Sequence, residues 1–116
     1  MIYRWYIDGT IGRAKTWVGG SYRVVSDCKP MRVDITVRET GERVNPTVID
    51  INDDGVSIFA GMNSNPAITP FQNYKTWDTF FENVIRAESV ITLDVDSVCE
   101  EKPCRDLTVE LEVEEV

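Results

Sequence analysis

The sequence predicts an all-β protein that folds as a single antiparallel β-sandwich of about seven or eight strands. Several stretches alternate apolar and polar side chains with a period of two, as half-buried antiparallel strands do. Turn residues separate these stretches about every 8 to 12 residues, a spacing typical of sandwiches and barrels. Sustained helical periodicity is nearly absent, and 116 residues suffice for one domain with one core.

The alternating stretches place the expected strands in order along the chain. Residues 1–30 hold three short candidates, at 2–7, 15–18 and 22–25, and this segment either pairs into the sheets or forms an arm. Residues 31–116 form the core of the sandwich. Its expected strands lie at 31–38, 47–52, 56–59, 91–96 and 107–114.

The clearest turn is Asp54-Gly55, because both positions of a two-residue hairpin turn favour positive φ. The register of this hairpin pairs inward-facing residues, Ile51 with Ile58 and Ile49 with Ala60. The run that starts at Asp50 also resembles part of an EF-hand calcium loop. Its twelfth position is Gly61 instead of a bidentate glutamate, so we expect a hairpin turn and no metal.

Residues 60–79 interrupt the alternation with two prolines and three asparagines. We expect a long loop whose aromatic side chains either plug the end of the sandwich or contact a partner. Thr76 could cap a short helical turn over 77–84. The helical spacing that suggests this turn is carried by four side chains: Trp77, Phe80, Phe81 and Val84.

Composition argues against several classes of function. The chain has no histidine, which removes the usual acid–base group of hydrolytic sites and the commonest metal ligand. Its net charge of −8 disfavours a nucleic-acid partner. No apolar run is long enough to span a membrane. We therefore expect a protein made in the cytoplasm that is not an enzyme and has no cofactor, nucleic acid or membrane partner.

The charge is uneven along the chain. Residues 1–43 carry eight basic and five acidic side chains, residues 44–93 two and six, and residues 94–116 two and nine. This polarity is either a neutral surface property or a source of complementary faces that steer association. The cations that could form a basic front are Arg4, Arg13, Lys15, Arg23, Lys29 and Arg32.

Two further groups of reactive side chains have ordinary structural interpretations. Carboxylates alternate on two expected strands, at Asp94 and Asp96 and at Glu110 and Glu112, where we expect a solvated sheet face instead of an acid–base or cation site. The chain has three cysteines, Cys28, Cys99 and Cys104. We expect free thiols, although the second and third could meet across a hairpin neck.

Four segments resemble a β-sandwich module of tailed-phage structural proteins. They are Asp50-Ile51-Asn52-x-x-Gly55-x-Ser57-Ile58-Phe59, Pro66-Ala67-Ile68, Ile91-Thr92-Leu93-Asp94-Val95-Asp96-Ser97-Val98 and Asp106-Leu107-Thr108-Val109. The resemblance covers roughly residues 31–113 and implies a jelly-roll-like domain in a virion. The quoted residues belong to turns, the core and sheet faces, so they imply no catalytic site.

What the resemblance implies is a capsid decoration (cement) protein at the virion surface, bound to the major capsid protein as a homotrimer. The alternative is a fibre or receptor-binding module that recognises host glycans. The expected interface residues, from the basic front and the long segment, are Arg4, Trp5, Arg13, Lys15, Trp17, Phe71, Tyr74 and Trp77.

Overall fold

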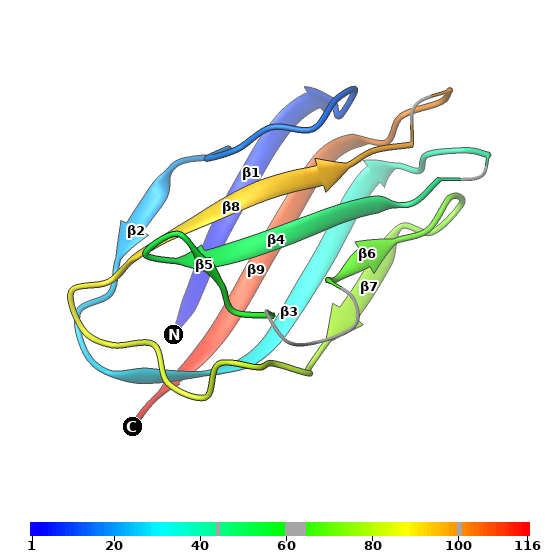
Figure 1. Cartoon of the computed structure of the whole chain (residues 1–116). Helices are drawn as coiled ribbons and strands as arrows, with labels where there is room; N and C mark the ends of the chain where they lie inside the picture. The colour runs from blue at the N-terminus through cyan, green and yellow to red at the C-terminus, as the bar shows by residue number, and fades with distance from the viewer. Residues whose placement is uncertain (44, 60–64, 100) are drawn as a thin grey trace.

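The computed structural model describes residues 1–43, 45–59, 65–99 and 101–116. Within these residues the chain forms nine strands and no helix, so no helix there could cross a membrane (Figure 1). The strands are β1 (Ile2–Thr10), β2 (Ser21–Arg23), β3 (Cys28–Glu39), β4 (Thr47–Asp53), β5 (Val56–Ser57), β6 (Ala67–Ile68), β7 (Tyr74–Trp77), β8 (Val90–Ser97) and β9 (Arg105–Glu115).

The strands form two antiparallel sheets packed face to face. The first sheet has the order β1-β9-β3-β7, and the second has the order β2-β8-β4-β5 with β6 paired to β4. The pairing follows one long hairpin folded over on itself, since β1 pairs with β9, β2 with β8, β3 with β7, and β4 with both β5 and β6. This nested pairing, split over two sheets, is the topology of a jelly roll. The predicted all-β sandwich is confirmed.

The centre of the nested hairpin is the predicted Asp54-Gly55 turn. Both residues have positive φ, 48° and 84°, as a two-residue hairpin turn requires. The N–H of Ile58 donates to the carbonyl of Ile51 over 3.0 Å, so these two residues lie opposite each other as the sequence predicts. The expected partner of Ile49, residue 60, lies outside the described residues.

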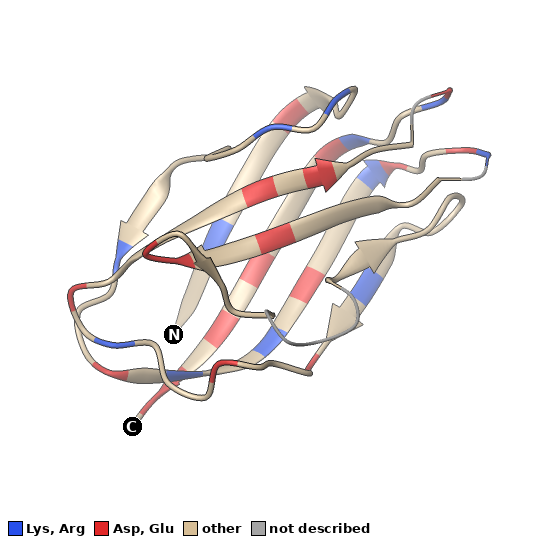
Figure 2. Cartoon of the chain, in the orientation of Figure 1, with Lys and Arg blue, Asp and Glu red and all other residues tan. Residues whose placement is uncertain are grey.

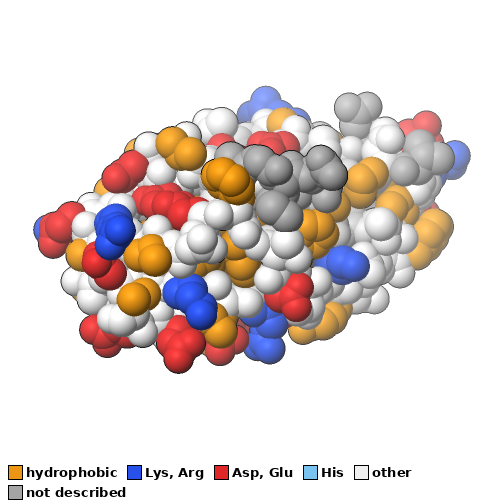
Figure 3. Space-filling model, turned by 60° about the horizontal axis from the view of Figure 1, so that its bottom comes forward, with side chains coloured by type: hydrophobic (Ala, Val, Ile, Leu, Met, Phe, Trp, Pro, Cys, Tyr) orange, Lys and Arg blue, Asp and Glu red, His pale blue; other side chains and the backbone are white. Residues whose placement is uncertain are grey.

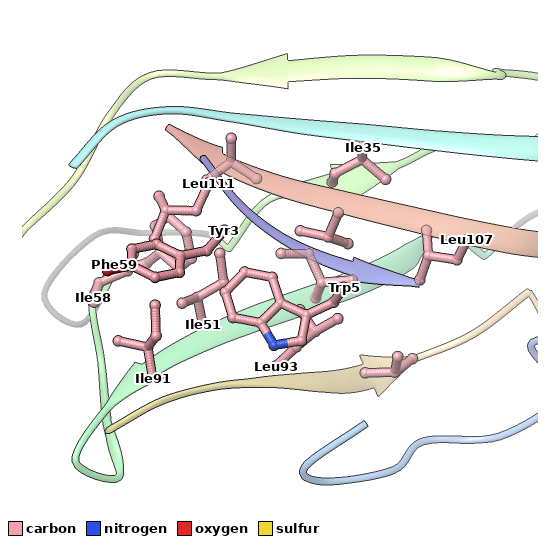
Figure 4. Close-up of a cluster of buried hydrophobic side chains, with 14 of the residues drawn as sticks. Tyr3, Trp5, Ile35, Ile51, Ile58, Phe59, Ile91, Leu93, Leu107 and Leu111 are labelled. Carbon is pink, nitrogen blue, oxygen red and sulfur yellow. The ribbon is translucent and has the colours of Figure 1, made fainter. Parts of the chain in front are cut away.

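Both sheets contribute their alternating apolar side chains to one core (Figure 4). Trp5 lies in this core with an exposed fraction of 0%, and its indole Nε1 donates to the carbonyl of Gly20 over 3.2 Å. Its ring meets that of Tyr22 edge to face, with centroids 5.4 Å apart. Since β1 pairs with β9 and β2 pairs with β8, the first thirty residues contribute two strands to the sandwich.

The predicted helical turn over 77–84 is wrong. Thr76 belongs to β7, where it lies opposite Asp34, so it caps no helix. Farther along, the N–H groups of Phe81 and Glu82 both donate to the carbonyl of Ile58 (3.0 and 3.1 Å), and Phe80 stacks on Phe59. The spacing therefore reflects a strand that ends at Trp77 and a following segment that docks beside Ile58 and Phe59, not a helix.

Two other expectations change. The long segment contains the short strands β6 and β7, which raises the strand number to nine. The expected strand at 15–18 is a loop with a single bridge between Lys15 and Val95. The chain there follows the edge of β8 without forming a ladder.

Candidate interaction surface

The loop between β1 and β2 is fixed to the sandwich along its length. Its backbone makes hydrogen bonds of 2.8–2.9 Å at three places: the N–H of Ile11 donates to Cys104, Lys15 and Val95 exchange a pair, and the N–H of Val18 donates to Leu93. Ile11 is buried and Val18 packs against the core. The loop is therefore a preformed part of the surface.

The same loop presents two cations and a tryptophan to solvent. Arg13 and Lys15 are exposed and form no ion pair with any residue that the structure describes. Trp17 is 66% exposed, and its N–H donates to Oδ1 of Asp94 over 2.9 Å. Its φ of 54° is unusual for a bulky residue and costs about 1 to 3 kcal/mol. Arginine and tryptophan are the residues that most often carry binding energy at interfaces.

Trp5, which we predicted as a contact residue, has a different role. It is completely buried between the sheets, so it cannot touch a partner while the protein is folded. The alternation of β1 explains this, because Tyr3 and Trp5 point inward while Arg4 and Tyr6 point outward. Arg4 is exposed, but its guanidinium pairs with Glu110 at 2.7 Å on the outer face of the first sheet.

The three predicted contact residues of the long segment do not form one cluster of free aromatic rings. Phe71 is exposed in the turn between β6 and β7, with φ 67°. Tyr74 is exposed, but its hydroxyl donates to Asp34 over 3.0 Å. Trp77 is partly buried against the core and donates its Nε1 to the carbonyl of Thr79. Hydrophobic side chains on the face shown in Figure 3 lie in separate groups among charged ones.

The uneven charge along the sequence does not produce two oppositely charged ends in the folded protein. Because β9 lies between β1 and β3, the acidic C-terminal strand is flanked by the basic front (Figure 2). The resulting cross-strand ion pairs are Arg4–Glu110, Arg32–Glu112, Arg38–Asp106 and Arg105–Glu39. In one of them, the N–H of Gly9 and the Arg38 guanidinium hold the pKa of Asp106 below its usual value.

The outer face of the second sheet is acidic. Asp50 lies directly opposite Asp94, and Asp96 follows on the same face of β8. Burial, and then repulsion from its neighbours, raises the pKa of Asp50, while Ser57 partly offsets this by donating to it over 2.6 Å. Burial and the charge of Asp94 likewise raise the pKa of Asp96. The described residues contain no group of acids, cysteines or histidines arranged to hold a metal.

The three cysteines are free and buried. Burial raises the pKa of the thiols of Cys28 and Cys104, which makes them less nucleophilic. Cys99 donates its thiol to the carbonyl of Glu42, and Cys104 lies 3.5 Å from the Thr47 hydroxyl. The three cysteines therefore have the surroundings of ordinary buried side chains.

Sequence reasoning missed one unusual group of carboxylates. Burial and contact with Asp53, with a smaller contribution from Asp54, raise the pKa of Glu82 to about 8. One carboxylate oxygen of Asp53, Oδ1, is buried without a hydrogen-bond partner in the described structure. No local pattern reveals the group, since its members are about thirty residues apart in the sequence.

Comparison with known proteins adds no relative to this description: no protein-family model, curated protein or solved structure matches the chain.

Proposed function

We propose that this chain is a non-enzymatic structural protein of a tailed-phage virion, a decoration protein that binds the outside of the icosahedral shell. The observation that carries the proposal is the β1–β2 loop, with Arg13, Lys15 and Trp17 exposed on a fixed backbone. Other cations of the basic front, Arg4 and Arg32 among them, are engaged in ion pairs on the first sheet. The loop is thus the cationic surface best suited to an acidic shell.

The resemblance to phage sandwich modules supports the same proposal, and so does the net charge of −8, which favours solubility before assembly. Binding to many equivalent lattice sites gives high avidity from a modest contact. We expect three copies to share a local three-fold position of the shell, each presenting its loop to the major capsid protein.

Co-sedimentation with shells that lack the protein tests this function. The purified chain should pellet with such shells and saturate at hundreds of copies per shell. Trp17→Ala should weaken binding because it removes the aromatic anchor, and circular dichroism should show that the variant is folded. Absence of binding to shells, or saturation at a few tens of copies, would refute a decoration role.

A second candidate, a fibre or receptor-binding module for host glycans, is favoured by one row of residues. On the outer face of the first sheet, the strand registers align Tyr6, Thr108, Thr36 and Tyr74 across all four strands. Two half-exposed tyrosines thus flank two threonines, a combination that can stack on sugar rings and bond their hydroxyls. Binding on a glycan array that is lost in Tyr74→Ala would support this candidate over shell binding.

A further inference from the structure

Residues 78–89, which connect β7 of the first sheet to β8 of the second, form a strap across one end of the sandwich (Figure 1). The N–H groups of Phe81 and Glu82 both donate to the carbonyl of Ile58, the residue that follows β5. These hydrogen bonds hold the strap against the β4–β5 hairpin and bring Glu82 next to it.

The strap also lies against Cys28, the first residue of β3. Cys28 and Ile85 exchange two backbone hydrogen bonds of 2.9 and 2.7 Å, and both side chains are buried. Beside them, Asp27 accepts from the N–H of Ala87 over 2.8 Å and pairs with Arg86, the cation of the strap, at 3.3 Å. The thiol of Cys28 is therefore buried while the strap is docked.

Carboxyl groups from both sides meet where the strap contacts the hairpin. Oδ1 of Asp53, at the end of β4, is buried without a hydrogen-bond partner among the described residues, although a buried carboxylate oxygen normally accepts at least one hydrogen bond. Burial, then contact with Asp53 and the charge of Asp54, raise the pKa of Glu82 to about 8. At neutral pH the carboxyl of Glu82 therefore keeps its proton and can donate a hydrogen bond to Asp53.

The other charged groups near this contact have different partners. Oδ1 of Asp54 accepts from the N–H of Val90 over 2.8 Å, and Arg86 is engaged by Asp27. Burial and the carboxylates at this end of the molecule raise the pKa of the Cys28 thiol, and the N-terminal ammonium partly offsets this. That ammonium itself donates to a backbone carbonyl of β9. Among the described residues, the strap's own carboxyl is therefore the donor available to the buried oxygen.

We propose that this contact is a proton-controlled latch: the strap is docked while Glu82 is protonated and donates to Oδ1 of Asp53, and it detaches when Glu82 loses its proton. Two carboxylates in contact repel each other and leave the buried oxygen without a donor, whereas detachment returns both groups to water. The detached strap uncovers Cys28 and the ring of Phe59, on which Phe80 stacks. The latch lies in a different part of the chain from the β1–β2 loop, so it does not depend on the proposed function.

Alkylation of Cys28 by iodoacetamide measures strap opening in the whole protein, with peptide mass spectrometry to identify the labelled thiol. The rate at each pH is divided by that of the urea-unfolded chain, which removes the ordinary pH dependence of thiol reactivity. This ratio should rise about tenfold between about pH 6 and about pH 9, because the docked state binds a proton that the open state releases. Cys104, buried directly before β9, reports global unfolding and should react at least about tenfold more slowly than Cys28.

Two charge-neutral variants locate the latch. Glu82→Gln keeps a donor for Asp53 at every pH, so the rise in Cys28 labelling should fall below about twofold. The matched control, Asp78→Asn, changes the net charge equally at an exposed residue of the same strap and should retain the full rise. The NMR spectrum shows whether each variant is folded, and in the unmodified protein the carboxyl carbon of Glu82 should titrate near pH 8. A midpoint near 4.5, no rise in Cys28 labelling, equal rates for Cys28 and Cys104, or the same pH dependence in both variants would overturn the inference.

Discussion

The outer faces of the two sheets differ in how their charged side chains are arranged. On the first sheet, arginines of β1 and β3 stand beside glutamates of β9, with ion pairs at 2.7 and 3.2 Å. On the second sheet, Asp50 faces Asp94 across two strands, and Asp96 lies next along β8. Opposite charges on paired strands stabilise a sheet, and like charges directly opposite destabilise it, by roughly 0.2 to 1 kcal/mol per pair.

This difference shows how topology redistributes the charge of the sequence. The nested hairpin brings the first strand beside the last, so the basic front and the acidic tail largely neutralise each other on one face. What remains is an acidic second sheet and, at its side, a loop whose two cations have no ion-pair partner among the described residues. The second sheet and the loop that borders it therefore carry charges without an opposite partner, as do a few residues near the end of the first sheet, such as Lys29 and Glu114, among the residues that the structure describes.

The largest expected effect concerns the residue that joins the two sheets. Trp5→Ala should lower the free energy of unfolding by about 3 to 5 kcal/mol, because it removes a completely buried indole and its bond to Gly20. Trp17→Ala, on the exposed loop, should change it by less than about 0.5 kcal/mol. Urea unfolding of both variants measures the difference. Equal losses would mean that Trp17 is as much a part of the core as Trp5.

A smaller effect on stability should depend on pH, and it arises at the carboxyl pair of Glu82 and Asp53 beside the β4–β5 hairpin. The pKa of Glu82 is about 8 in the folded protein and near 4.5 without its neighbours. The folded state therefore binds the extra proton between these values, and stability falls as pH rises through this window. We expect a loss of about 1 to 2 kcal/mol after allowance for solvent screening.

Unfolding in urea at about pH 6 and about pH 9 measures this loss. In Glu82→Gln the amide donates to Asp53 at both pH values, so most of the difference should disappear. A variant that keeps the full pH dependence would show that a group other than Glu82 is responsible.

The smallest effects compare the two faces directly, because matched substitutions on them should change the free energy of unfolding in opposite directions. Asp96→Asn on the second sheet should stabilise the protein by about 0.3 kcal/mol by relieving repulsion from Asp94. Glu110→Gln on the first sheet should destabilise it by about 0.5 kcal/mol by removing the partner of Arg4. Thermal unfolding at low salt compares them. The same sign for both would mean that the two faces do not differ energetically.

The fold was largely predictable from the sequence because its signals are local. The alternation around Ile35 and Leu111 marks the inward faces of β3 and β9, and Asp54-Gly55 fixes the central hairpin. Residues that pack by tertiary contact were harder to assign. The spacing of Trp77 and Phe80 suits a helix, yet one lies at the end of β7 and the other stacks on Phe59.

The candidate surface was predictable only in part. Composition identified Arg13, Lys15 and Trp17 as candidate contacts, but it could not show that Trp17 is exposed while Trp5 is buried. Which tryptophan is buried depends on the inward face of β1, which is fixed by pairing with a strand about a hundred residues away. The ion pair between Arg4 and Glu110 has the same long-range origin. Which cations remain free is therefore a property of the topology.

The central claim is that the free cations of the β1–β2 loop contact the shell, and two variants of equal net charge test it. Arg13→Gln with Lys15→Gln removes the loop cations, whereas Arg4→Gln with Arg32→Gln removes paired cations of the first sheet. The measurement is the dissociation constant of each variant for shells that lack the protein. We predict about tenfold weaker binding for the loop variant and little change for the other. Unchanged binding of the loop variant, or equal losses in both, would contradict the account.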